Sequence, residues 1–331
     1  MNNTDIVDFV VTWVDNTDPK WLEKKAKYTG CTYSEENPEA RYRDWDTLKY
    51  WFRGVEKFAP WVRYVWFVTD DQKPEWLNVD HPKLKWVRHT DYIPEEYLPT
   101  FQANTIELNL HRIEGLAEQF VYFNDDMFLI RQTQPMDFFV DGLPCDLPQT
   151  DYIYPASVFS HILFNNANLL NRHFSLRESA ARDWKKWFLR QSPKGFLKNV
   201  FFCRKDLIPG FVHEHVHISF LKSTFHVLWE KEYDCIHETC THKQRTRLDV
   251  SDWCVRNWQL LEGKFYPKKL CGKSFSTHDL ETNGALTYMQ KQKGKVICLN
   301  DNEREKDYAV HREQVIAAFE KLLPEKSAFE L

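Results

Sequence analysis

Two adjacent carboxylates interrupt an apolar run in the stretch QFVYFNDDMFLI, residues 119–130. The apolar residues at its start are typical of a buried strand, which then ends at Asn124, Asp125 and Asp126. Two buried like charges without a partner are costly, so the pattern implies a counter-ion, water or a ligand beside this pair. A helix-capping turn is the alternative explanation for an isolated pair of this kind.

Acidic residues also end two other predicted strands. The run DIVDFVVTWVD (5–15) ends at Asp15, and YVWFVTDD (64–71) ends at Asp70 and Asp71. In a parallel α/β sheet, ligands bind outside the carboxyl ends of the strands, so we expect these carboxylates and the first pair to meet at one edge. Hard oxygen ligands suit Mg²⁺ or Mn²⁺, and the edge is therefore predicted to bind a divalent cation together with a phosphorylated ligand.

Three histidines are candidates for a general base. His213, His215 and His217 alternate within FVHEHVHISF (211–220), and alternation predicts that they share one face of a strand. A near-neutral pKa suits a base, so we expect one of the three to take this role. The other two would then pack or form hydrogen bonds.

Zinc binding is the alternative for the same histidines. Further ligands would come from Cys235, His237, Cys240 and His242. Neither spacing fits C-x₂-C…H-x₃₋₅-H, and HEHVH is not H-E-x-x-H, so the zinc hypothesis is the weaker one.

One carboxylate and two arginines complete the set of chemical candidates. Glu107 lies on a helix predicted over 104–120, which leads into the acidic strand end and can bring Glu107 to the same edge. Arg245 and Arg247 suit a bidentate clamp on phosphate, although either would be unremarkable at the surface.

The elements that must position these residues alternate along the chain. A helix is predicted from Leu48 to Phe58, a strand over 83–89, a strand and turn over 296–307, and a closing helix over 310–323. Strands that alternate with helices predict an α/β fold with a mostly parallel, Rossmann-like sheet covered on both faces.

Bulk composition limits the classes of partner. The 331 residues carry a formal net charge of -4, which argues against nucleic-acid binding. There is no apolar run of 18 residues and no basic segment typical of a signal peptide, so we expect a cytoplasmic protein whose eight cysteines are reduced. Peripheral attachment at the inner face of the membrane stays open.

The stretch 172–206 differs from the rest of the chain. It holds ten basic and three acidic residues, with Trp184, Trp187 and Phe188 between them. Such a net positive stretch in an acidic chain predicts an anionic partner, either a charged polysaccharide or a membrane surface. A solvated helix with a core-facing aromatic stripe is the alternative.

Four separated blocks of the sequence resemble the Stealth family of polysaccharide phosphotransferases. The first is DFVVTWVDNTD (8–18), and the second runs from RYRDWDTLKYWFRG through LPTFQANTIELNLHRIEGLAEQFVYFNDDMFL. The third extends from HVH at 215 through HKQRTRLDVSD to LLEGKF, and the fourth is CLNDN (298–302) with the closing LLPEKSAFEL. Together they cover well over half of the chain in the family's order. Many members have His-x-Pro where this chain has His215–Val216–His217.

The resemblance implies one catalytic domain over 1–331 and a specific reaction. Residues 1–170 would bind the nucleotide sugar, 171–210 would form a basic aromatic helical insertion, and 211–331 would complete the active site. The family transfers a sugar 1-phosphate from a UDP-sugar to a hydroxyl of a glycan or lipid-linked polysaccharide acceptor. The reaction forms a phosphodiester and releases UMP.

Positions of this sequence that match the family's motifs receive roles by resemblance. The catalytic group would be His215, Arg245, Glu107 and Asp126, with Asp125 and Asp126 holding Mg²⁺ or Mn²⁺. Substrate-binding positions would be Asp8, Trp13, Asp15, Asp249, Asn300, Asp301 and Asn302. We expect His215 to be the base, with Glu107 as the alternative.

Two other functions compete with this one. A metal-dependent glycosyltransferase would use the same UDP-sugar, break the bond from the sugar to oxygen, and release UDP. A non-catalytic glycan- or lipid-binding module would explain the aromatic residues and the basic stretch, but not the acidic strand ends.

Overall fold

A five-stranded sheet lies at the centre of the computed structural model, which describes residues 6–31, 33–34, 37–302 and 304–331. The strand order is β3-β2-β1-β4-β8, with β1 to β4 parallel and β8 antiparallel to β4. The bounds are β1 (Val7–Thr12), β2 (Val65–Thr69), β3 (Leu84–Arg88), β4 (Gln119–Phe123) and β8 (Ile218–Leu221). Because β2 and β3 lie on one side of β1 and β4 on the other, the chain reverses direction across the sheet between β1 and β4.

Two smaller sheets flank the central one. The first has the order β10-β11-β5, and the second has the order β6-β7-β9. Their strands are β5 (Met127–Leu129), β10 (Gly272–Ser276) and β11 (Val296–Asn300), then β6 (Phe139–Val140), β7 (Leu143–Asp146) and β9 (Tyr266–Pro267). The turn Asn124–Asp126 therefore connects a strand of the central sheet to a strand of the second sheet.

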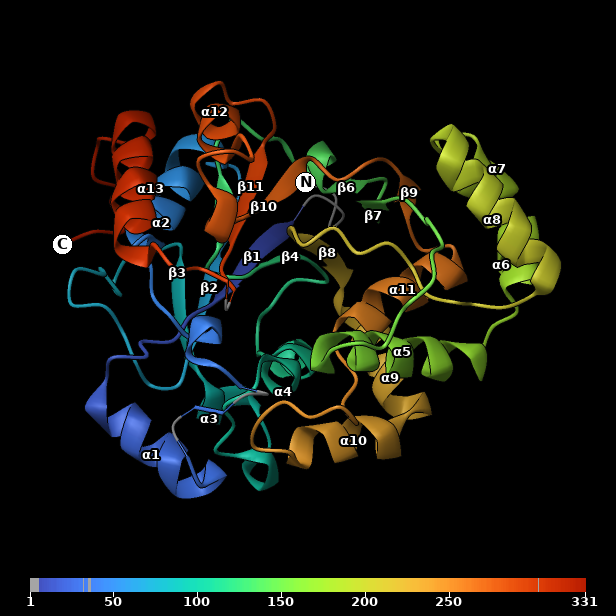
Figure 1. The fold of residues 1–331 in the computed structure, drawn as a ribbon, viewed down its shortest axis with the longest axis horizontal. Coiled ribbons are helices and arrows are strands. Elements are labelled where there is room, and N and C mark those ends of the chain that lie inside the picture. The colour runs from blue at the N-terminus through green and yellow to red at the C-terminus, as the bar shows by residue number, and fades with distance from the viewer. Residues whose placement is uncertain (1–5, 32, 35–36, 303) are drawn as a thin grey trace.

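Side chains of the central strands alternate between two hydrophobic cores. Phe9 and Val11 of β1 belong to one core, while Val10 belongs to the other. Helices α2 and α13 pack in the first core, and α5, α9, α10 and α11 pack in the second, on opposite sides of the sheet (Figure 1). Burial on both faces explains why these strands are continuous apolar runs rather than alternating ones.

The helices are distributed along the whole chain. Their bounds are α1 (Pro19–Thr29), α2 (Leu48–Phe58), α3 (His89–Tyr92), α4 (Ala103–Leu108), α5 (Val158–Asn171), α6 (Leu176–Arg182), α7 (Trp184–Phe188), α8 (Pro193–Lys205), α9 (Lys222–Lys231), α10 (Tyr233–Thr241), α11 (Trp253–Glu262), α12 (Ala285–Gln290) and α13 (Tyr308–Leu322). Among the described residues, none of these helices has the length and apolar character needed to cross a membrane.

The predicted α/β class with a mostly parallel sheet is confirmed. The expected strands over 64–71 and 83–89 correspond to β2 and β3, and the expected helix from Leu48 to Phe58 is α2. The first predicted strand corresponds to β1, although its first residue, Asp5, lies outside the described residues, as does Glu303 of the stretch 296–307.

The single helix predicted over 104–120 is wrong. Helix α4 ends at Leu108, a 3-10 turn covers Leu110–Arg112, and Gly115 has a φ of +79°. A residue with positive φ cannot continue a right-handed helix, so the chain turns there before β4 begins at Gln119. Leu110 and Ile113 are nevertheless buried, because the turns present them to the same core.

Candidate active site

A cavity of about 520 Å³ opens at the carboxyl ends of the parallel strands. Thr12 and Trp13, at the end of β1, line it together with the turn Asn124–Asp126 after β4. These two strand ends flank the point where the chain reverses direction across the sheet, which is where open α/β sheets form their ligand crevice.

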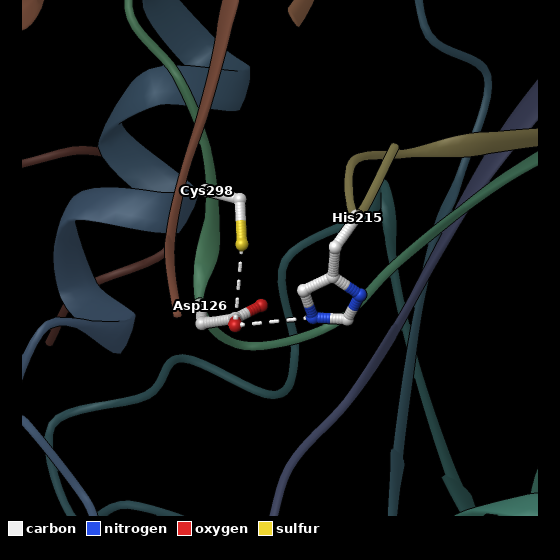
Figure 2. A group of neighbouring side chains, drawn as sticks. All are labelled: Asp126, His215 and Cys298. Atoms are coloured by element: carbon white, nitrogen blue, oxygen red, sulfur yellow. Dashed lines mark hydrogen bonds and ion pairs between the residues drawn. The ribbon is translucent and has the colours of Figure 1, made fainter. Parts of the chain in front are cut away.

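Asp126, His215 and Cys298 form a close group at this cavity (Figure 2). The Nε2 atom of His215 lies 3.4 Å from Oδ2 of Asp126, and the Cys298 thiol lies 3.3 Å from the same oxygen. Each residue comes from a different segment, because Cys298 lies on β11 and His215 lies just before β8. The geometry thus joins the two sheets at one carboxylate.

His215 is held so that one ring nitrogen stays available. Its Nε2 faces Asp126, which favours the tautomer with the proton on Nε2 and a lone pair on Nδ1. Burial opposes the charged imidazolium, but the neighbouring carboxylates of Asp126 and Glu107 outweigh it, so the pKa of His215 is raised above its ordinary value. A ring of this kind accepts a proton more readily than an isolated histidine.

The predicted strand for the three histidines is wrong, because β8 begins at Ile218, after all of them. His217 is buried against Phe138, with ring centroids 5.0 Å apart, and burial lowers its pKa to about 3. His213 packs on Trp253 and lies 3.2 Å from the amide of Asn257. Three different environments therefore replace the single face, and His215 is the one that meets Asp126.

The proposed zinc ligands do not gather around this site. Among the residues that the structure describes, the group close enough to share an ion is Asp126, His215 and Cys298. His237 bonds the hydroxyl of Tyr97, and His242 bonds Asp249 at 2.7 Å, each within its own part of the fold. The distances therefore oppose a zinc site built from the four downstream residues.

Glu107 reaches the cavity as expected, and a second buried carboxylate, Asp252, lies beside it. The Tyr122 hydroxyl donates a hydrogen bond of 2.8 Å to Glu107, and the same hydroxyl lies 3.0 Å from Thr12. Burial raises the pKa of both carboxyls, and Glu107 raises that of Asp252 further. Two adjacent buried carboxyls favour sharing one proton, which gives this pair a single negative charge.

Arg245 supplies positive charge to the same cavity. Its charge acts to lower the pKa of Glu107 and of Asp252, against the effect of burial. Arg247, predicted as a second phosphate clamp, is exposed and does not line the cavity. Of the two predicted arginines, Arg245 therefore lines the cavity and Arg247 does not, while Arg41 and Arg43 also contribute to the cavity wall.

Asp249 holds the loop that carries Arg245. It is fully buried and accepts hydrogen bonds from the Thr246 backbone N–H at 2.8 Å and from the Thr246 hydroxyl at 2.9 Å, beside its contact with His242. Asp249 does not line the cavity, so its expected contact with substrate is replaced by a contact that positions the Arg245 loop.

Asp8 lies at the opposite end of β1 from the cavity. Its buried carboxylate accepts hydrogen bonds from Arg63, from the Trp66 indole at 2.8 Å and from the Ala117 backbone N–H at 2.9 Å. With both oxygens occupied, Asp8 has no acceptor left for a ligand. The structure therefore does not bring Asp8 to the cavity, and a substrate contact by this residue stays a prediction without support from the geometry.

The acidic strand ends converge only in part. Asp70 lines the cavity, paired with Lys24, whereas Asp71 is exposed and lies outside the lining. Asp15 also lies outside it, because its carboxylate accepts the Thr17 backbone N–H at 2.8 Å and so closes a turn before α1. The expectation that all three strand ends meet is wrong for Asp15 and Asp71.

The residues after β11 line the far side of the cavity. Asn300, Asp301 and Asn302 all contribute to its wall. Asp301 accepts a hydrogen bond of 3.0 Å from the Trp45 indole and an ion pair of 3.0 Å from Arg43. The amide of Asn302 is also engaged within the chain, donating to the Ser276 hydroxyl at 2.6 Å and accepting from the Arg304 backbone N–H at 2.9 Å. These contacts fix the loop, and substrate binding by the three residues stays a prediction.

The acidic side of the cavity fits a divalent cation. Oδ1 of Asp126 is buried and has no hydrogen-bond partner among the described residues. Burial, Asp126 and Asp44 together raise the pKa of Asp125 well above its ordinary value, and burial raises that of Asp44 to about 6. The free oxygen of Asp126 is a hard donor of the kind that Mg²⁺ or Mn²⁺ prefers, and His215 and Cys298 are the described groups close enough to share an ion with it. A cation held by Asp125 and Asp126 stays a prediction.

Sequence reasoning missed Asp44, Asp252 and Cys298 as members of the site. Asp44 lies four residues before the predicted start of α2, and it lines the cavity. Asp252 is the residue before α11, where an acidic residue normally signals only a helix cap. The one available signal was position, because all three lie inside or beside the blocks that also supply the predicted residues.

Comparisons with known proteins agree with this arrangement. The family model "Stealth protein CR1, conserved region 1" matches residues 7–30, and "Stealth protein CR2, conserved region 2" matches residues 41–145. The two matched ranges include β1, Asp44, Glu107 and the turn with Asp125 and Asp126.

Whole-length relatives extend the match to the remainder of the chain. The capsular polysaccharide phosphotransferase WcwK of Streptococcus pneumoniae is 38% identical over 100% of this chain and 99% of its own. The receptor polysaccharide phosphotransferase WefC of Streptococcus oralis is 39% identical over 98% and 99%, respectively. The exopolysaccharide phosphotransferase cps2G of Lactiplantibacillus plantarum is 39% identical over 98% and 96%.

Proposed function

The chain belongs to the Stealth family, and from this premise we propose that it transfers a sugar 1-phosphate from a UDP-sugar to a hydroxyl of a glycan acceptor. The coarser activity, phosphotransfer in polysaccharide synthesis, is that of its full-length relatives. The donor would be a UDP-hexose or a UDP-N-acetylhexosamine, and the products a phosphodiester and UMP. The acceptor is a growing or lipid-linked polysaccharide.

The observation that carries the proposal is the pairing of His215 with Asp126 at the carboxyl ends of the sheet, in the same cavity as Arg245. Transfer of a phosphoryl group needs a base, in-line positioning and compensation of phosphate charge. His215 can serve as the base, while the positive charge of Arg245 and a metal ion held by the carboxylates would compensate phosphate charge. All of these groups lie at the same cavity of about 520 Å³.

The base is His215. The acceptor O–H gives its proton to Nδ1, its oxygen forms a bond to the β-phosphorus, and the bond from that phosphorus to the bridging oxygen breaks, which releases UMP. Asp126 stabilises the imidazolium that forms, through its contact with Nε2. Glu107 is the less suitable base, since it already accepts a hydrogen bond from Tyr122 and lies beside Asp252.

Charge on the phosphates is met from two sides. Arg245 binds phosphate oxygens on one side of the cavity, where its guanidinium has no ion-pair partner among the described residues. Asp125 and Asp126 would hold Mg²⁺ or Mn²⁺ on the other. A bound cation of this kind neutralises charge on the leaving phosphate.

Product analysis tests the proposal against its alternatives. The protein is incubated with a panel of UDP-sugars and an acceptor polysaccharide, and the nucleotides are separated by liquid chromatography. Release of UMP is expected. Release of UDP would identify a glycosyltransferase, and an unchanged UDP-sugar for every donor and acceptor would favour a binding module.

A further inference from the structure

Helix α8 presents apolar side chains to solvent. Its inward positions are Gly195, Asn199 and Phe202, which follow the spacing of one helix face. Its outward positions include Phe196, Leu197 and Phe201, and Leu197 is 67% exposed. A surface helix of a globular domain normally places polar residues on its outward face, whereas the outward face of α8 is apolar.

Neighbouring segments extend this apolar face. Trp184 of α7 and the residue after that helix, Leu189, are 51% and 64% exposed, although Trp187, which the sequence grouped with them, is fully buried. The exposed aliphatic and aromatic residues of this part are Trp184, Leu189, Phe196, Leu197, Phe201 and Leu207. We call this set the α7–α8 surface; its helices stand at the edge of the molecule, away from α2 and α13 (Figure 1).

Basic residues surround the α7–α8 surface, but fewer are free than composition indicates. Arg172 pairs with Glu232, Arg182 with Asp183, and Lys198 with Asp151. No ion pair within the described part of the chain involves Lys185, Arg190, Lys194, Arg204 or Lys205, and all five are exposed. Cations next to exposed apolar side chains are complementary to a surface that is anionic outside and apolar beneath.

Further exposed rings lie just before α5 and in its first turn. Tyr152 packs on Phe202 of α8, with ring centroids 4.7 Å apart, and Tyr154 follows at 6.4 Å from Tyr152. Phe159, in the first turn of α5, is 38% exposed and lines the cavity. Exposed aromatic rings are thus present both beside α8 and in the wall of the cavity.

We propose that the α7–α8 surface docks on an anionic lipid bilayer and brings the cavity to acceptors that end at the membrane. Three of its six exposed residues are leucines, which have no flat face for stacking on sugars but enter lipid readily. The free basic residues would contact anionic headgroups, whose negative potential attracts each of them. A purely glycan-binding surface would be expected to present aromatic rings without leucines.

Vesicle sedimentation tests the proposal. The wild-type protein should bind vesicles of phosphatidylcholine with phosphatidylglycerol, and binding should fall with added salt. The variant Lys185→Gln, Lys194→Gln, Arg204→Gln should partition about 100-fold more weakly, at roughly fivefold for each basic residue. The variant Leu197→Glu, Phe201→Glu should bind about tenfold more weakly or worse, since it removes apolar insertion.

Matched variants on the opposite side of the molecule serve as controls. Val310→Glu on α13 replaces an exposed apolar residue, and Lys291→Gln with Lys293→Gln and Lys321→Gln replaces exposed basic ones; both should bind vesicles like the wild type. Circular dichroism and phosphotransfer to a short soluble acceptor should be unchanged in every variant, which separates a failure of docking from a failure of the proposed chemistry.

Three results would overturn the proposal. These are no binding of the wild type to anionic vesicles, unchanged binding by the Leu197→Glu, Phe201→Glu variant, and equal loss in the control variants. Binding of soluble dextran sulfate that depends on the three basic residues but not on Leu197 would assign the surface to an anionic glycan instead.

Discussion

The carboxylates at the two ends of the central parallel strands have opposite environments. At the amino end, Asp8 is enclosed by an arginine, an indole and backbone N–H groups, so both of its oxygens are occupied. At the carboxyl end, Asp125 and Asp126 lie among other carboxyls, and one oxygen of Asp126 is buried without a partner. The residue at both ends is aspartate, and β1 and β4 are neighbouring strands of the same sheet.

The difference shows what distinguishes a structural carboxylate from a functional one in this protein. A carboxylate with all its hydrogen bonds made within the chain stabilises the fold and can bind nothing else. A carboxylate that lacks hydrogen-bond partners, beside other carboxyls whose pKa is raised, lowers the free energy of unfolding. It retains the ability to bind a cation. The sequence analysis assigned both residues to the site, Asp126 from its strand end and Asp8 by resemblance, because an acidic residue beside an apolar run does not reveal its partners.

The largest effect should follow from removing the divalent cation proposed at Asp125 and Asp126. EDTA should abolish phosphotransfer, and added Mg²⁺ or Mn²⁺ should restore it, because the carboxyls of Asp125 and Asp126 otherwise repel the phosphates. Asp126→Asn should be inactive with metal present, whereas Asp71→Asn, at an exposed strand end, should be fully active. Full turnover in EDTA with metal-free substrates would contradict a catalytic role for a divalent cation.

The second largest effect should distinguish the roles of His215 and His217. His215→Ala should lower kcat by roughly 10²–10⁴, the usual contribution of a positioned acid–base group, with an unchanged unfolding transition. His217→Ala should lower the free energy of unfolding, because it leaves a space beside Phe138, and should cost much less activity. Equal losses of kcat in both variants would mean that the base has been assigned to the wrong residue.

A smaller effect, on stability alone, is expected at the amino end. Asp8→Asn should lower the free energy of unfolding by about 3 kcal/mol, since it leaves Arg63, the Trp66 indole and backbone donors around a neutral side chain. Urea denaturation measures this loss, and kcat of the folded fraction should equal that of the wild type. A loss of kcat at unchanged stability would instead return Asp8 to the substrate.

The smallest effect is a change in pH dependence. His217 has a pKa lowered to about 3 by burial, so it stays neutral in the folded chain while the unfolded chain gains a proton below about pH 6.5. Its contribution to stability is therefore complete above pH 6.5 and falls by about 1.4 kcal/mol per pH unit below it. His217→Leu should reduce the pH slope of the unfolding free energy by that amount between pH 6 and 5. An unaltered slope would show that His217 is not neutral in the fold.

The sequence predicted the central strands well because burial on both faces leaves continuous apolar runs that need no partner to be recognised. It failed between Leu108 and Gln119, where Gly115 ends the helical pattern in spite of apolar spacing that continues. It also failed for the histidines, because alternation before β8 arises from a bend rather than from a strand. Which carboxylates reach the cavity depends on loop partners such as Thr17 for Asp15, and these partners are set by tertiary contacts.

The turn Asn124–Asp126 also limits how the length of this chain can vary. Within three residues it ends β4 in the central sheet and places Met127 opposite Cys298 in the second sheet, and the Leu299 N–H donates to the Asp126 carbonyl at 2.9 Å. An inserted or deleted residue would reverse the faces of β5 relative to β11 and turn the Asp126 carboxylate away from His215. Insertions and deletions within Asn124–Asp126 should therefore not be tolerated, even when both aspartates are kept.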